Sequence, residues 1–252
     1  MRTPEEIELQ HKKAELTVLE DELADKELEL ETLMVRLDVF EVRYKRIIGI
    51  RYAELDEIEA KIAEELARRN PGDAKAKNQA KDARKKAEES TRETRGALEQ
   101  QDKEKFEPSE DLKKLYWEIA KKVHPDLASD EKDRERRNKF MAEVNNAYRN
   151  GDEAKLKSLL REWDSSPESV KGEGVAVDLV RVIRKIARGR ERLKVIAREI
   201  EKLMESELHR LMGDVEEAEK GGRDLLGELV GMIGEKIAGS KERLRAVRKE
   251  QG

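Results

Sequence analysis

The sequence predicts an all-α protein in which long coiled-coil helical hairpins flank a small helical domain. Three observations predict this class: 44% of the 252 residues are charged, only 4% are aromatic, and leucine and isoleucine recur at helical spacing. High charge of both signs with few aromatic residues is typical of long helices that carry ion pairs. So few aromatic side chains do not fill one large globular core.

The N-terminal part of the chain predicts a helical hairpin. Thr3 and Glu6 have the spacing of a capping box, which marks the start of a helix. Leucines then recur at steps of three, four and seven, as in a coiled coil, until the phase shifts past Gly49. We expect a kink or a locally unwound turn there. Pro71-Gly72 ends the helix, and the alanine-rich helix after it is expected to pack back against the first.

Short amphipathic helices are expected over residues 110–123, 131–149 and 152–163. Each carries its apolar residues on one side, and together they hold much of the aromatic content of the chain. Helices of this kind bury their apolar stripes against one another. They therefore predict the compact domain of the protein.

Two long helices are expected after a linker at Ser165-Ser166-Pro167. The first carries its apolar pattern over residues 175–215, and the second over residues 226–247. Gly221-Gly222 predicts the turn between them. No apolar run approaches the length of a membrane-spanning helix, and the N-terminus lacks the apolar stretch of a signal peptide. We therefore expect a soluble cytoplasmic protein without a membrane partner.

The residue inventory argues against an enzyme. The chain has no cysteine, which excludes disulfides and thiol chemistry. Its three histidines lie far apart in sequence, so no metal-site spacing is visible. The carboxylates are spread along helix faces, where ion pairing explains them. Since there is also no glycine-rich phosphate loop and no triad-like set of residues, we expect no catalytic residue, metal or cofactor.

The tripeptide His124-Pro125-Asp126 is the one place where the sequence indicates a specific activity. By itself it is a weak signal, because a proline that ends a helix and an aspartate that favours a turn also explain it. Its surroundings are more specific. It closes the stretch KKLYWEIAKKVHPD at residues 113–126, and a second helical stretch, FMAEVNNAY, follows at residues 140–148.

These two stretches resemble helix II, its loop and helix III of the J domain in DnaJ-type co-chaperones. The resemblance covers residues 106–163, and it implies that a DnaK-type ATPase chaperone is the partner. In this family the His-Pro-Asp loop docks on the chaperone and speeds its ATP hydrolysis. The resemblance therefore assigns the triggering role to His124, Pro125 and Asp126, with the Asp126 carboxylate available to an arginine of the partner.

The resemblance also implies a second contact surface, the face of helix 110–123 that lies opposite its apolar stripe. In the family this face is basic and meets an acidic surface of the partner. Here it carries Lys113, Lys114, Trp117 and Lys121, while Trp117 and Glu118 occupy positions where basic residues are common. For Trp117 two interpretations stay open: a binding hot spot, or packing beneath a coiled-coil arm. The first helix of the family, its glycine/phenylalanine-rich linker and its zinc-binding cysteines are absent.

The prediction therefore divides the chain into a coiled-coil hairpin (1–105), a J domain (106–164) and a C-terminal coiled-coil arm (165–252). The arms would select an unknown client and pair either within the chain or between copies of it. One alternative is a structural coiled coil with a vestigial J-like module. Another is nucleic-acid binding by a basic stripe, although such a stripe also suits pairing with residues 1–70, which carry 19 acidic and 12 basic side chains. That stripe consists of Arg181, Arg184, Lys185, Arg188 and Arg192.

Overall fold

The computed structural model describes residues 2–99, 106–128, 130–164 and 174–249. All regular elements within these ranges are helical, so the predicted all-α class is confirmed. The predicted linker at 165–167 lies outside the described residues. The chain divides into two compact units, each built from two separate stretches of sequence. Both units draw on more than one of the three predicted domains.

The first long helix forms as its sequence predicts. It begins with α1 (Pro4–Tyr44), where the Glu6 backbone N–H donates to Thr3 Oγ1 and the Thr3 N–H donates to the Glu6 carboxylate. The phase shift past Gly49 corresponds to a π-helical turn, η1 (Lys45–Gly49), before α2 (Ile50–Arg69). A π-turn adds a residue to one helical turn, so it resets the side-chain register without ending the helix.

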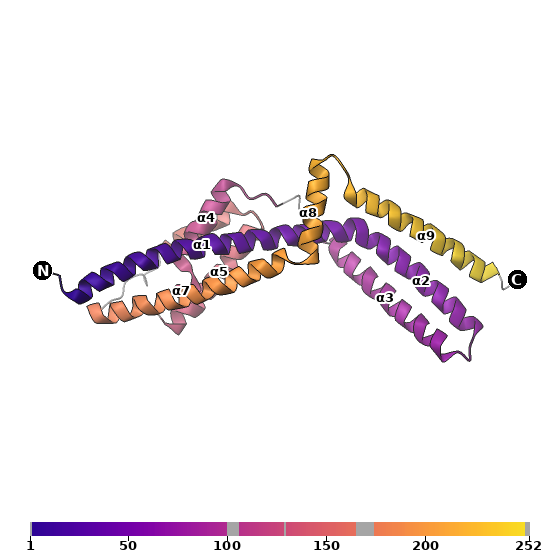
Figure 1. Ribbon diagram of the computed structural model, residues 1–252, viewed down its shortest axis with the longest axis horizontal. Coiled ribbons are helices and arrows are strands. Elements are labelled where there is room, and N and C mark those ends of the chain that lie inside the picture. Colours follow the sequence, from indigo (N-terminus) through magenta and orange to yellow (C-terminus); the bar gives the residue numbers. More distant parts are fainter. Residues whose placement is uncertain (1, 100–105, 129, 165–173, 250–252) are drawn as a thin grey trace. The chain divides into compact units, whose positions relative to one another are not determined.

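The first compact unit comprises residues 1–36 and 106–206. Besides the start of α1 it contains α4 (Glu110–Val123), η2 (Pro125–Leu127), α5 (Glu131–Arg149), α6 (Glu153–Asp164) and α7 (Val175–Met204). One core joins α4, α5 and α6 to Ala24 and Leu28 of α1. A second core joins leucines of α1 to α7 and includes Leu127 of η2. The helices α1 and α7 run side by side in Figure 1.

The second compact unit comprises residues 37–105 and 207–252. The predicted hairpin is confirmed, because α2 packs against α3 (Ala74–Glu99) after the Pro71-Gly72 turn. The helix α2 also packs against α9 (Leu225–Lys249), which follows α8 (Glu207–Lys220). Figure 1 shows α2 between α3 and α9. Ion pairs support both contacts: Lys86 meets the buried Asp56 at 2.8 Å, and Lys241 meets Glu54 at 2.7 Å.

The C-terminal region differs from the prediction at one point. The expected helix over residues 175–215 is interrupted, because α7 ends at Met204 and α8 begins at Glu207. At the break, Ser206 Oγ donates to the Leu203 carbonyl at 2.6 Å, which satisfies a carbonyl group at the end of α7. The turn at Gly221-Gly222 forms as predicted, with Gly222 at φ +75°.

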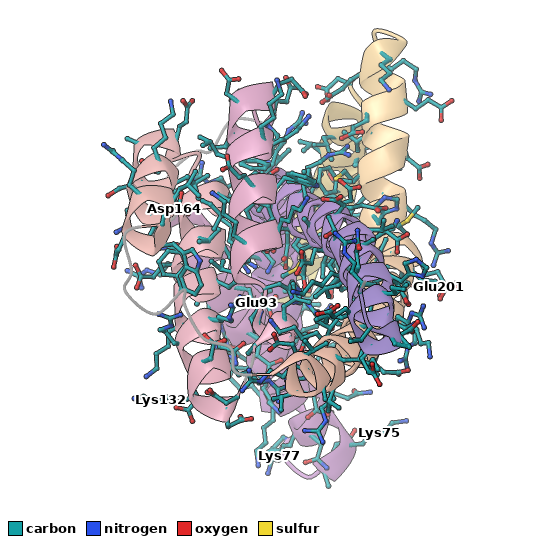
Figure 2. All side chains as sticks on the ribbon, turned by 90° about the vertical axis from the view of Figure 1, so that its left-hand side faces the viewer. Lys75, Lys77, Glu93, Lys132, Asp164 and Glu201 are labelled. Carbon is teal, nitrogen blue, oxygen red and sulfur yellow. The ribbon has the colours of Figure 1, made fainter. Side chains whose placement is uncertain are left out.

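Charged side chains project from the outer faces of the helices, which fits the ion-pair-rich composition. Figure 2 shows Lys75 and Lys77 on α3 and Lys132 on α5 pointing away from their helices. Many of the exposed charges pair with a neighbour three or four residues away, such as Lys26 with Glu29 at 2.6 Å. Surface pairs of this kind contribute little stability. The apolar seams between the helices therefore provide most of it.

Candidate functional site

The His-Pro-Asp tripeptide forms a short turn between two packed helices. Ser109 caps α4 by accepting the Leu112 N–H at 3.1 Å, and Asp130 caps α5 in the same way. The apolar stripe of α4 packs against α5 and α6, and the ring centroids of Tyr116 and Tyr148 lie 4.6 Å apart. The turn follows Val123, whose side chain belongs to this core, and its own Leu127 packs in the core between α1 and α7.

Three hydrogen bonds donated by backbone N–H groups make the turn rigid. The N–H of Leu127 donates to the His124 carbonyl and that of Ala128 to the Pro125 carbonyl, each at 3.1 Å. The N–H of Asp126 donates to Nδ1 of His124 at 3.2 Å. Together with the fixed φ of Pro125, these bonds hold the turn in a single-turn 3-10 helix. Little conformational entropy would be lost if such a turn docked on a partner.

His124 is buried, with 2% of its surface exposed. Because its Nδ1 accepts the Asp126 N–H, its Nε2 is the donor toward Glu27 Oε1 of α1, at 2.9 Å. Glu27 Oε1 also accepts from Arg192 of α7 at 2.9 Å. Burial opposes ionisation of Glu27, yet the hydrogen bonds from His124 and Arg192 hold the pKa of its carboxyl below the ordinary value. The histidine thus lies in a charged hydrogen-bond chain within its own protein.

Asp126 is placed differently from His124. Its side chain is 20% exposed, and one carboxylate oxygen forms a long ion pair with Arg134 at 3.9 Å. The other oxygen lies 3.9 Å from His124 Nδ1, and both distances exceed that of a hydrogen bond. Among the described residues this carboxylate accepts no hydrogen bond. Pro125 beside it is partly exposed. The tip of the turn therefore presents a carboxylate that can accept donors from another molecule.

The predicted contact face of α4 is divided between solvent and α1. Lys114 is exposed, and Lys113 pairs with Glu110 at 2.9 Å within the helix. Trp117 instead donates its indole N–H to Asp25 of α1 at 2.8 Å. Trp117 therefore contacts a long arm, as one of the two interpretations expects, while its role as a binding hot spot stays a prediction.

Lys121 contacts the same arm, since it forms an ion pair with Asp21 of α1. Its ammonium group also lies 5.2 Å from the centroid of the Trp117 ring. Two of the four predicted face residues, Trp117 and Lys121, therefore contact α1, and a third, Lys113, pairs within α4.

Sequence reasoning missed Glu27 as a partner of His124. Glu27 is one of many acidic residues in the first arm, and no local motif distinguishes it. The only available signal was the charge balance between this acidic arm and the basic stripe of residues 181–192. The structure confirms that pairing for Arg192, and it adds a bond from Arg190 to Glu15 at 2.5 Å.

The described residues show neither a metal site nor a membrane-spanning helix. Within the part of the chain that the structure describes, no group of three or more histidine or carboxylate side chains could hold a metal ion. None of the described helices is long and apolar enough to cross a membrane.

Comparison with known family models, with curated proteins and with solved structures found no match to this chain.

Proposed function

We propose that this protein is a co-chaperone that recruits a DnaK-type ATPase chaperone through the turn at residues 124–126 and stimulates its ATP hydrolysis. The observation that carries this proposal is the Asp126 carboxylate, which sits partly exposed on a rigid turn between α4 and α5 and accepts no hydrogen bond from the described residues. A carboxylate held in this way suits a bidentate arginine on a partner protein. The resemblance of residues 113–126 and 140–148 to a J domain names the class of partner.

The chemistry would take place in the partner. A docked turn needs no nucleophile or metal of its own, because it acts by favouring one conformation of the ATPase. The exposed Lys114 would add a charge contact beside the turn. In this proposal the long helices select the client or the site at which the chaperone is recruited.

The test is single-turnover ATP hydrolysis by a DnaK-type chaperone, measured with a saturating concentration of the full chain. We expect the wild type to raise the hydrolysis rate and Asp126→Asn to abolish most of that increase. Asp126 suits this test better than the buried His124, because its carboxylate is bound less tightly within the fold. The matched control is Asp111→Asn, which removes an exposed carboxylate from α4 and should leave stimulation unchanged. Equal stimulation by wild type and Asp126→Asn would refute the proposal.

One observation favours a second function, that of a structural coiled coil with a vestigial J-like module. His124 is buried against α1 rather than presented to solvent. A scaffold would use this histidine only to join α1, η2 and α7. The same assay separates the two functions, because a scaffold would give no stimulation at any concentration.

A further inference from the structure

We propose that α1 is a built-in competitor of the chaperone partner: its acidic residues Asp21, Asp25 and Glu27, here called the acidic clamp, occupy the partner-binding groups of α4 and η2. The clamp must be released before the partner engages the whole site. This inference rests on the proposed function, because it concerns regulation of the same turn. All the contacts involved lie within the first compact unit.

The clamp meets the groups that the partner would need. Asp21 pairs with Lys121, and Asp25 accepts the indole N–H of Trp117. Both pairs present a carboxylate to a donor on the predicted contact face of α4. The resemblance implies that this face meets an acidic surface of the partner, so the clamp supplies charge of the same sign from within the chain.

The clamp also covers the turn itself. Oε1 of Glu27 accepts hydrogen bonds from both His124 and Arg192 of α7. Leu127, the residue after the tripeptide, is 3% exposed and packs between α1 and α7. A partner protein therefore cannot contact His124 while α1 and α7 remain in place. Asp126 stays partly exposed and Lys114 exposed, so a first encounter through these two residues is still possible.

The contacts between the acidic clamp and α4 are weak enough to break and re-form in the folded protein. Asp25 is exposed, and the side chains of Asp21 and Lys121 are 41% and 28% exposed. Pairs in such positions contribute little individually and are weakened by solvent. When the clamp leaves the site free for only a fraction of the time, the apparent affinity for the partner is the intrinsic affinity multiplied by that fraction. The clamp is thus expected to raise the concentration needed for stimulation, without lowering the maximal rate.

The test uses charge reversal on the full chain. The double variant Asp21→Lys, Asp25→Lys places two cations opposite Lys121 and Trp117, at one half-buried position with a side chain 41% exposed and one exposed position. We expect the concentration for half-maximal ATPase stimulation to fall at least about threefold, with an unchanged maximal rate. The matched control is Glu22→Lys, Glu29→Lys, which makes the same charge change at exposed positions of the same helix and should leave the half-maximal concentration unchanged.

A second measurement follows the turn directly. In the Asp21→Lys, Asp25→Lys variant, hydrogen exchange at the amides of Leu127 and Ala128 should be faster than in the wild type and in the control. Adding Asp126→Asn to the Asp21→Lys, Asp25→Lys variant should abolish its stimulation. If the wild type stimulates at saturation but the Asp21→Lys, Asp25→Lys variant has the same half-maximal concentration, the competition by the acidic clamp is refuted and the proposed function stands. If neither the wild type nor the Asp21→Lys, Asp25→Lys variant stimulates ATP hydrolysis at any concentration, the proposed function is refuted. Regulation of that function by the acidic clamp is then refuted as well.

Discussion

Gly189 of α7 lies so close to Leu19 of α1 that a Cβ atom built on Gly189 would be 2.7 Å from Leu19 Cδ2. The same Cβ would be 3.1 Å from Cδ1 of Leu23, and both leucines are buried. The absence of a side chain at Gly189 is therefore what lets the two helices approach closely. This approach also brings α7 and its Arg192 up to Glu27.

The first prediction concerns this contact. Gly189→Val should lower the free energy of unfolding by about 1–3 kcal/mol, because the added atoms overlap a packed core. Urea denaturation followed by circular dichroism measures the change. Gly213→Val in α8 is the control, since nothing lies within 4 Å of a Cβ at that position. Equal stability of the two variants would show that α1 and α7 do not pack at this distance.

The second prediction concerns Glu27 and pH. Glu27→Gln should cost about 1–3 kcal/mol near neutral pH, because it removes the charge from two partly buried hydrogen bonds. The pKa of Glu27 is lower in the folded protein than its ordinary value of 4.5, so the unfolded chain takes up the proton first as the pH falls. The stabilisation is therefore fully present above pH 4.5 and is lost as the pH falls through the lower, folded pKa.

Unfolding curves of the wild type and Glu27→Gln at several pH values measure this difference. The two proteins should converge in acid and separate toward neutral pH. Glu22→Gln is the control, because Glu22 is exposed on the same helix and its replacement should have little effect at any pH. A constant difference between wild type and Glu27→Gln across this range would contradict the assignment of the charge to Glu27.

The third prediction concerns the buried carboxylate of Glu31, which is 4% exposed and forms an ion pair with Arg149. Arg149→Met should cost about 3 kcal/mol, because it leaves a buried charge without its main partner. The double variant Glu31→Leu, Arg149→Met should regain most of that loss. A double-mutant cycle by urea denaturation gives the coupling between the two residues. If the changes in unfolding free energy caused by the two substitutions are additive, the stabilising interaction between Glu31 and Arg149 is refuted.

Local signals in the sequence predicted the local structure well. The capping box at Thr3 and Glu6, the Pro71-Gly72 turn and the register change at Gly49 each depend on residues that are neighbours in the chain. The same holds for Ser109, which starts α4. These features could be predicted because capping and turn formation need no information from distant segments.

Long-range pairing could not be predicted in the same way. A leucine seam accepts many other seams, so the sequence did not indicate that Leu28 of α1 would join the core of the short helices. It also gave no reason to connect His124 with Glu27, which is 97 residues away. The break between α7 and α8 was missed because the apolar pattern continues through it to Val215, while only Ser206 marks the end of a helix.

The division of the first compact unit between two stretches of sequence has a consequence for synthesis on the ribosome. Chains fold from the N-terminus as they emerge, so α1 is already present when the turn at His124 leaves the exit tunnel. Arg192 follows seconds later at translation rates of about 5–20 residues per second. A nascent chain therefore passes through an interval in which Glu27 can reach the turn while α7 has yet to close over it. During that interval the turn lacks the cover that α7 gives it in the folded chain.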